Sequence, residues 1–188
     1  MKRLQSLTTT LSLILAVFFM SGCATNLTKP TAAPSPTKVK LSEFTHVEMK
    51  DVGISQKFGT AAANQKAQKK IEEVLFQEML MVFPNLKRID KGGDFASSGE
   101  RTLQITPFIK EIKFIGGGAR FMVGAMAGSS AVLMQVTLRD SASGEVIAEP
   151  EFYRDANAYS GGWSMGATDN RMLEDIAKDI VQYCSLNK

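Results

Sequence analysis

The sequence has little of the chemistry that most active sites use. It contains one histidine, His46, and two cysteines, Cys23 and Cys184, among 188 residues. A structural zinc site takes four cysteine, histidine or carboxylate ligands, so this composition argues against a bound metal. A Ser–His–Asp triad would have to use His46, and with so many serines such a match means little. We therefore expect no enzyme, no metal and no cofactor, with a hydrolase or small-ligand binder using His46 as a minor alternative.

Phosphate and nucleic-acid signatures are also missing. The run Gly116-Gly117-Gly118 lacks the lysine of a P-loop and the spacing of a dinucleotide fingerprint. The turn 140–145 lacks the carboxylate spacing of an EF-hand. Removal of the first 22 residues would leave 20 basic against 19 acidic side chains. A nucleic-acid binder needs a basic stripe, so we expect no nucleic-acid partner.

The amino terminus is typical of an exported protein. Lys2 and Arg3 precede the apolar stretch 11–20, which is followed by small residues. This order predicts a signal peptide over residues 1–22. The stretch is shorter than the roughly 20 apolar residues of a membrane span.

The exit of this signal peptide reads Met20-Ser21-Gly22-Cys23 and resembles the lipobox of bacterial lipoproteins. The resemblance implies lipidation of Cys23, with an ordinary secretory signal and a chance cysteine as the alternative. Several acyl chains, each contributing about 0.8 kcal/mol per buried CH₂, would anchor the chain stably. Ala24 replaces the aspartate that resembles an inner-membrane retention signal. We therefore expect anchoring to the periplasmic face of the outer membrane.

Residues 23–38 differ in composition from the rest of the chain. Proline, threonine, alanine and serine dominate, and this predicts a semi-extended tether. Fully extended, such a segment would reach about 50 Å, so we expect it to hold the domain away from the membrane. Residues 39–188 then form a single periplasmic domain. Because lipidation would occupy Cys23, Cys184 has no intrachain partner, and we expect it to be buried or to form an intermolecular link.

Two helices are predicted from one-sided apolar faces. The first extends over residues 61–83, where apolar residues recur every three or four positions before Pro84. The second begins near Thr168 or Asp169, either of which suits an N-cap, and buries residues up to Cys184.

Alternating apolar residues predict the strands, at 39–49, 86–89, 101–114, 131–139 and 145–159. Pro107 should mark an edge or a bulge, and Pro150 should interrupt the last strand. The element order β-α-β-β-β-β-α, with short hairpins, predicts an α+β fold. We expect a mainly antiparallel sheet of four or five strands with two helices on one face.

The segment 114–133 is apolar or small throughout, apart from Arg120, and has three interpretations. A transmembrane helix would bury Arg120 at a cost of about 2.5–3.5 kcal/mol. A short helix would leave a docking segment for another chain or a membrane, with Gly124 and Gly128 one turn apart and the larger apolar residues elsewhere on the helix. A glycine-rich connection would instead use its apolar residues to cap the domain's own core. The candidate docking residues are Arg120, Phe121, Met122, Gly124, Met126 and Gly128.

Residues 115–159 resemble an uncharacterised family of small bacterial envelope lipoproteins with a domain of unknown function. The matching features are Arg120, the apolar triplet after it, Gly124, Gly128, the strand ending at Asp140, and Gly144. The resemblance implies a small periplasmic α+β domain and transfers no catalytic residue. We expect a non-enzymatic binding or assembly module, with an envelope protein or a second copy as partner. The alternative is an oligomeric secretion or pore subunit.

Overall fold

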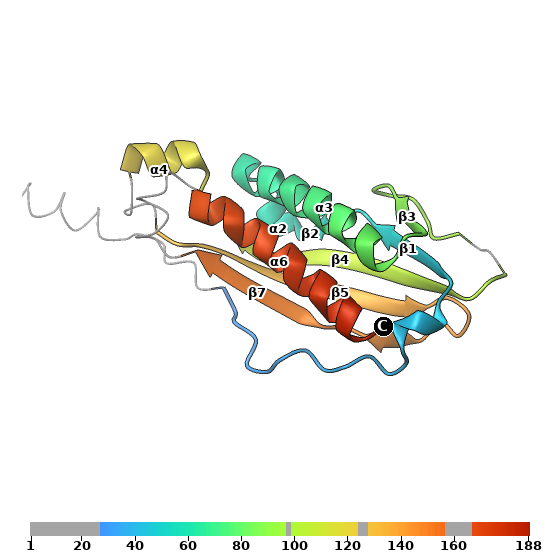
Figure 1. The fold of residues 1–188 in the computed structure, drawn as a ribbon. Coiled ribbons are helices and arrows are strands. Elements are labelled where there is room, and N and C mark those ends of the chain that lie inside the picture. Colours follow the sequence, from blue (N-terminus) through green and yellow to red (C-terminus); the bar gives the residue numbers. More distant parts are fainter. Residues whose placement is uncertain (1–26, 97–98, 124–127, 157–166) are drawn as a thin grey trace, which may run out of the picture.

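The computed structural model describes residues 27–96, 99–123, 128–156 and 167–188. Within them, helices α3 (Ala62–Val82) and α6 (Ala167–Leu186) lie side by side on one face of a seven-stranded sheet (Figure 1). The predicted signal peptide and Cys23 lie outside the described residues. The α+β class and the two covering helices are confirmed.

The sheet is mixed. Its main path is β3-β1-β4-β5-β6, while β2 pairs with β4 and β7 pairs with β5. β1 is parallel to both β3 and β4, β2 is parallel to β4, and all pairs made by β5 are antiparallel. The strand bounds are β1 His46–Lys50, β2 Gly53–Ile54, β3 Leu86–Ile89, β4 Thr102–Lys113, β5 Ser130–Asp140, β6 Val146–Ala148 and β7 Glu151–Ala156.

The prediction of four or five mainly antiparallel strands was therefore wrong for the first half of the chain. The long crossover through α3 returns the chain beside β1 in the same direction, as a β-α-β unit does. The short strand β2 and the short helix α2 (Gln56–Gly59) were also not predicted. Only the later strands, β4 to β7, follow the antiparallel pattern.

The predicted strand over 39–49 is shorter and begins later. A 3-10 turn, η1 (Leu41–Glu43), precedes β1, and the Phe44 N–H donates to the Leu41 carbonyl. The Leu41 N–H in turn donates to the Asn187 carbonyl at the end of α6, at 2.8 Å. Leu41 is thus buried in a turn that precedes the strand. Its even spacing from the apolar residues of β1 does not reflect strand structure.

Pro107 lies within the central strand β4, at a break in its parallel ladder. β1 pairs with β4 as far as Ile105, and β2 resumes the pairing at Phe108. On the other side, Pro107 faces Val136, whose N–H donates away from β4 to the Pro150 carbonyl. The proline nitrogen therefore faces the gap between β1 and β2, where no donor is required.

The core lies between the helices and the sheet. α3 contributes one buried stripe, α6 a second, and the strands supply the facing side chains. Burial of each large aliphatic side chain contributes roughly 1.5–3 kcal/mol. The fully buried large members include Leu41, Ile71, Leu75, Met79, Leu103, Ile105, Ile109, Ile112, Met134, Leu138 and Leu173. The predicted burial of Cys184 is confirmed, and burial raises the pKa of its thiol to about 12.

Candidate functional site

The segment between β4 and β5 forms a short helix, α4 (Gly117–Val123), and is not one continuous helix. β5 already begins at Ser130, so a transmembrane span over 114–133 is excluded. Among the helices that the structure describes, none is both long and apolar enough to cross a bilayer. α4 lies at one end of the molecule, beyond the first turns of α3 and α6 (Figure 1).

Three consecutive large apolar residues of α4 are exposed. Phe121 is 76% exposed, Met122 is 83% exposed and Val123 is 51% exposed. The interpretation in which these residues cap the domain's own core is therefore wrong for α4, although Ile115 just before it is buried. Arg120 belongs to the same helix, Gly128 follows it on the return to β5, and Gly124 and Met126 lie outside the described residues.

The base of α4 is held by two buried polar side chains. Asn64 of α3 accepts a 3.0 Å hydrogen bond from the Phe114 N–H and donates to the carbonyls of Phe58 and Ile112. The Ser130 hydroxyl oxygen accepts a 3.0 Å bond from the Ile115 N–H. The connection from β4 into α4 is thus tied to α3 and to the start of β5, so α4 leaves the sheet from a defined position. The sequence analysis missed Asn64, although it shares the apolar stripe of its helix.

Gly128 ends the excursion in a left-handed conformation with φ of 86°. This region suits glycine because a Cβ there is strained. A Cβ added to Gly128 would also come within 3.2 Å of the Lys113 Nζ. The glycine is therefore explained by backbone geometry, without a helix partner one turn away.

The amino-terminal segment begins at the same end of the sheet. The Thr28 N–H donates to the Glu111 carboxylate of β4 at 3.0 Å, only six residues before α4 begins. The Lys29 ammonium lies 5.6 Å from the ring centroid of Tyr153 on β7. Leu27 is buried at 9% exposure. The start of the described chain is therefore anchored close to α4.

A second apolar cluster lies outside the main core at this end. Leu133 is opposite both Glu111 and Tyr153 in the sheet, and it alternates with the helix-facing residues of β5. It is nevertheless only 3% exposed. The buried apolar residues that do not belong to the main core are Leu27, Ile115, Ala131 and Leu133. Leu27 and Thr28 thus lie over a patch of sheet that the helices leave uncovered.

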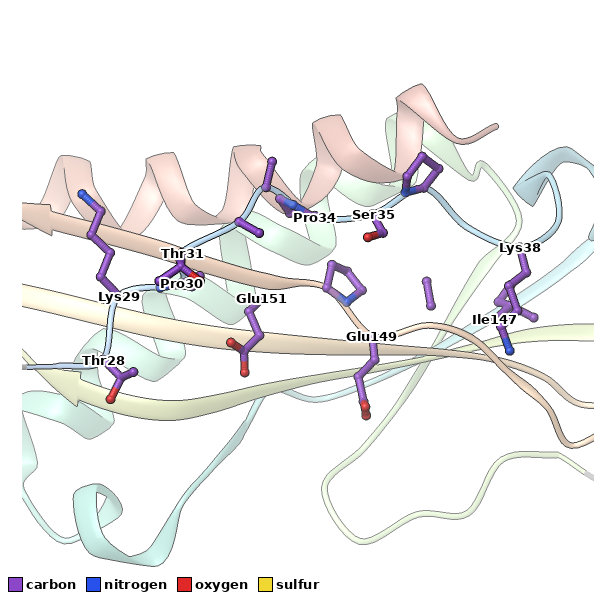
Figure 2. Close-up of a pocket in the computed structure, with 15 residues that line it drawn as sticks. Thr28, Lys29, Pro30, Thr31, Pro34, Ser35, Lys38, Ile147, Glu149 and Glu151 are labelled. Carbon is purple, nitrogen blue, oxygen red and sulfur yellow. The ribbon is translucent and has the colours of Figure 1, made fainter.

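From there the segment follows β7 to the opposite end of the domain (Figure 2). The Ser35 carbonyl accepts a 2.8 Å bond from the Tyr183 hydroxyl, and the Thr37 N–H donates to the Asn187 side chain. The Lys38 N–H donates to the Ile147 carbonyl at 3.1 Å. An open groove of about 710 Å³ remains between the segment and the β6–β7 connection. Residues 27–38 are extended, as predicted, but they pack along the domain and do not extend away from it.

His46 takes part in a surface ion pair. Its Nε2 lies 2.9 Å from the Glu100 carboxylate, and both side chains are about half exposed. The hollow beside them measures only about 90 Å³. Across the described ranges 27–96, 99–123, 128–156 and 167–188, no three metal-ligating side chains meet.

The acidic turn after β5 has a structural role. Burial alone would raise the pKa of Asp140, but hydrogen bonds from Arg101 and from the Ala142 N–H lower it below its usual value. Gly144 follows with φ of 71°, as the tight turn requires. The carboxylate is therefore fully occupied by protein donors.

Comparison with known proteins shows the fold alone. No protein-family model matches the chain, and no curated protein matches its sequence. Protein XCC0632 of Xanthomonas campestris, described by the family model DUF330, is 11% identical, with a TM-score of 0.52 over 84% of this chain and 93% of that one. A PelC dodecamer subunit from Paraburkholderia phytofirmans is 14% identical, with a TM-score of 0.45 over 78% and 96% of the two chains. The likeness to XCC0632 agrees with the small α+β domain that the sequence resemblance implied.

Proposed function

We propose that this protein is a non-enzymatic lipoprotein, attached through acylated Cys23 to the periplasmic face of the outer membrane, and that it binds or assembles envelope components there. The proposal rests on the lipobox at residues 20–23 and on the absence of aspartate at position 24. The structure adds one supporting observation, which is where the amino-terminal segment is anchored.

The contacts of Leu27 and Thr28 support an arrangement in which a lipid on Cys23 would lie close to the α4 end. Three residues separate Cys23 from Leu27, so four residue steps of at most about 3.6 Å give a reach of roughly 14 Å. Thr28 is bonded to Glu111 near the end of β4. A lipid on Cys23 would therefore hold the α4 end against the membrane, with the far end of the domain pointing into the periplasm.

Binding, as opposed to catalysis, is supported by how the only histidine is used. His46 is half exposed and paired with Glu100 beside a hollow too small for most ligands. If this is right, His46→Ala should leave every envelope phenotype of the protein unchanged. A phenotype equal to that of a deletion would favour the hydrolase or small-ligand alternative.

The anchor is tested by metabolic labelling with an alkyne fatty acid, followed by membrane fractionation. The wild-type chain should carry the label and enter the outer-membrane fraction, whereas Cys23→Ser should be unlabelled and soluble in the periplasm. Cys184→Ser is the matched control, because its thiol is buried, and it should fractionate like the wild type. An unlabelled wild-type chain in the soluble fraction would overturn the proposal.

An oligomeric secretion or pore subunit is the second candidate, because exposed Phe121 and Met122 also suit contacts between copies. Light scattering of the detergent-solubilised protein separates the two. A single large species that Phe121→Ser dissociates would favour the oligomer. A monomer at all concentrations would exclude it.

A further inference from the structure

We propose that the three exposed apolar residues of α4, namely Phe121, Met122 and Val123, insert into the same membrane leaflet as the lipid on Cys23 and form a second point of membrane attachment. This inference rests on the proposed lipid anchor and specifies what covers the exposed face of α4. The occupant is the bilayer itself.

The first argument is the position of the chain's start. Thr28 is bonded to Glu111 on the strand that leads directly into α4, and Leu133, opposite Glu111, lies on the strand that leads away from it. Only three residues lie between Leu27 and Cys23. The lipid and the exposed residues of α4 are therefore confined to the same end of one pair of strands.

The second argument is the character of α4. Its sequence, GGARFMV, contains no acidic residue, and its large apolar side chains are consecutive. Transfer of apolar surface from water to hydrocarbon is favourable in proportion to its area. Basic side chains gather nearby, with Lys66 and Lys70 lining the hollow between the start of α3 and Gly116–Gly118. The Lys70 ammonium forms an ion pair with Glu174. Lys66 lines the same hollow and would contact anionic headgroups.

The third argument excludes a second copy as the sole occupant. A stable protein interface buries about 800 Å² on each partner and involves roughly 20–30 residues of each. Three side chains on a seven-residue helix supply a small part of that area. A bilayer sets no such minimum, because an anchored chain needs only a small additional contact to fix its orientation.

The experiment places an environment-sensitive fluorophore at Phe121→Cys in the full lipidated protein, reconstituted in vesicles of phosphatidylethanolamine and phosphatidylglycerol. The two native cysteines do not compete, because Cys23 would be acylated and Cys184 is buried. The matched control is Met81→Cys, which is equally exposed at 82% but lies at the end of α3 away from α4 (Figure 1). Neither substitution removes a core side chain.

If α4 inserts, the label at position 121 should shift its emission to the blue and be quenched several-fold by doxyl lipids, while the label at position 81 should behave as in water. Equal, water-like emission at both positions in membrane-bound protein would overturn the insertion and leave the anchor intact. A shielded label that doxyl lipids do not quench, with crosslinking between copies at position 121, would assign the face to a second copy and also overturn it. A chain recovered unlipidated and soluble would overturn both proposals.

Discussion

The Tyr183 hydroxyl, on the last helix, donates a 2.8 Å hydrogen bond to the Ser35 carbonyl, 148 residues earlier in the chain. This bond joins the amino-terminal segment to the core, because the Tyr183 ring also packs edge-on against Phe152 of β7 at 5.8 Å between centroids. The segment that composition identifies as a tether is therefore part of the folded domain.

Tyr183→Phe tests how firmly that segment is held. The substitution keeps the ring contact with Phe152 and removes only the hydrogen bond, so the free energy of unfolding should fall by about 1 kcal/mol. Urea denaturation measures this loss. Limited proteolysis should cleave the segment 27–38 faster in the variant while the rest of the domain stays resistant. An unchanged cleavage rate would show that the other contacts hold the segment without Tyr183.

Alkaline pH should destabilise the protein through two adjacent residues. Burial is the main cause that raises the pKa of Tyr183 from 10.0 and of Cys184 from 9.0, each to about 12. Both groups favour the neutral form when folded, so their contribution is fully present below pH 9 and is lost as the pH rises towards 12. Urea midpoints across this range should show the decline, and Cys184→Ala should remove the part between pH 9 and pH 10. An unaltered curve in that variant would contradict the role of the thiol.

Leu133→Ala tests the apolar cluster beneath Leu27. Truncation of a buried leucine costs about 2–5 kcal/mol, and here it should also release the segment 27–38 to proteolysis under conditions where the domain stays folded. Leu138→Ala is the matched control, because it removes the same atoms from the same strand on the helix-covered face. It should destabilise the domain comparably without exposing the segment. Equal protease sensitivity in both variants would refute a separate cluster.

Asn64→Ala should loosen the base of α4. The variant removes the side-chain partner of the Phe114 N–H and of two carbonyls, of which that of Ile112 is bonded in a buried position. A buried group left unsatisfied costs about 1–3 kcal/mol. Hydrogen exchange should accelerate at Phe114. Asn64→Asp, which still accepts from Phe114 but cannot donate to the carbonyls, should protect that amide while remaining less stable than the wild type. Slow exchange in the alanine variant would mean that Ser130 alone fixes α4.

The parts of the fold that sequence predicted are those set by local pattern. α3 carries a one-sided apolar face, and its bounds differ from the expected ones by one residue at each end. α6 was likewise located by its apolar face. The turn after Asp140 could also be predicted, because its residues are turn formers. In contrast, the parallel pairing of β1 with β4 depends on where a long connection returns, and no local pattern encodes that.

Sequence predicted the residues of α4 in the candidate site but not the course of the amino-terminal segment beside them. Phe121 and Met122 were named as docking residues because the segment 114–133 is apolar or small almost throughout, and a short helix there would leave a surface for another chain or a membrane. The course of residues 27–38 was missed because Leu27 is the only large apolar residue between Cys23 and Lys38. That segment is held mainly by backbone groups bonded to distant side chains, such as Thr37 to Asn187, and composition carries no trace of such bonds.

The route of the amino-terminal segment also determines how the protein would respond to mechanical load. A pull on Cys23 would act first on Thr28 and Leu27 at the α4 end, and then on Ser35 and Lys38 in turn, because these contacts succeed one another along β7. The twelve residues 27–38 would detach one contact at a time and release roughly 40 Å of chain before the force acted on β1. In a pulling experiment this would appear as a short extension at low force, ahead of the cooperative rupture of the sheet. The packed segment would thus lengthen under load while the sheet and helices keep their fold.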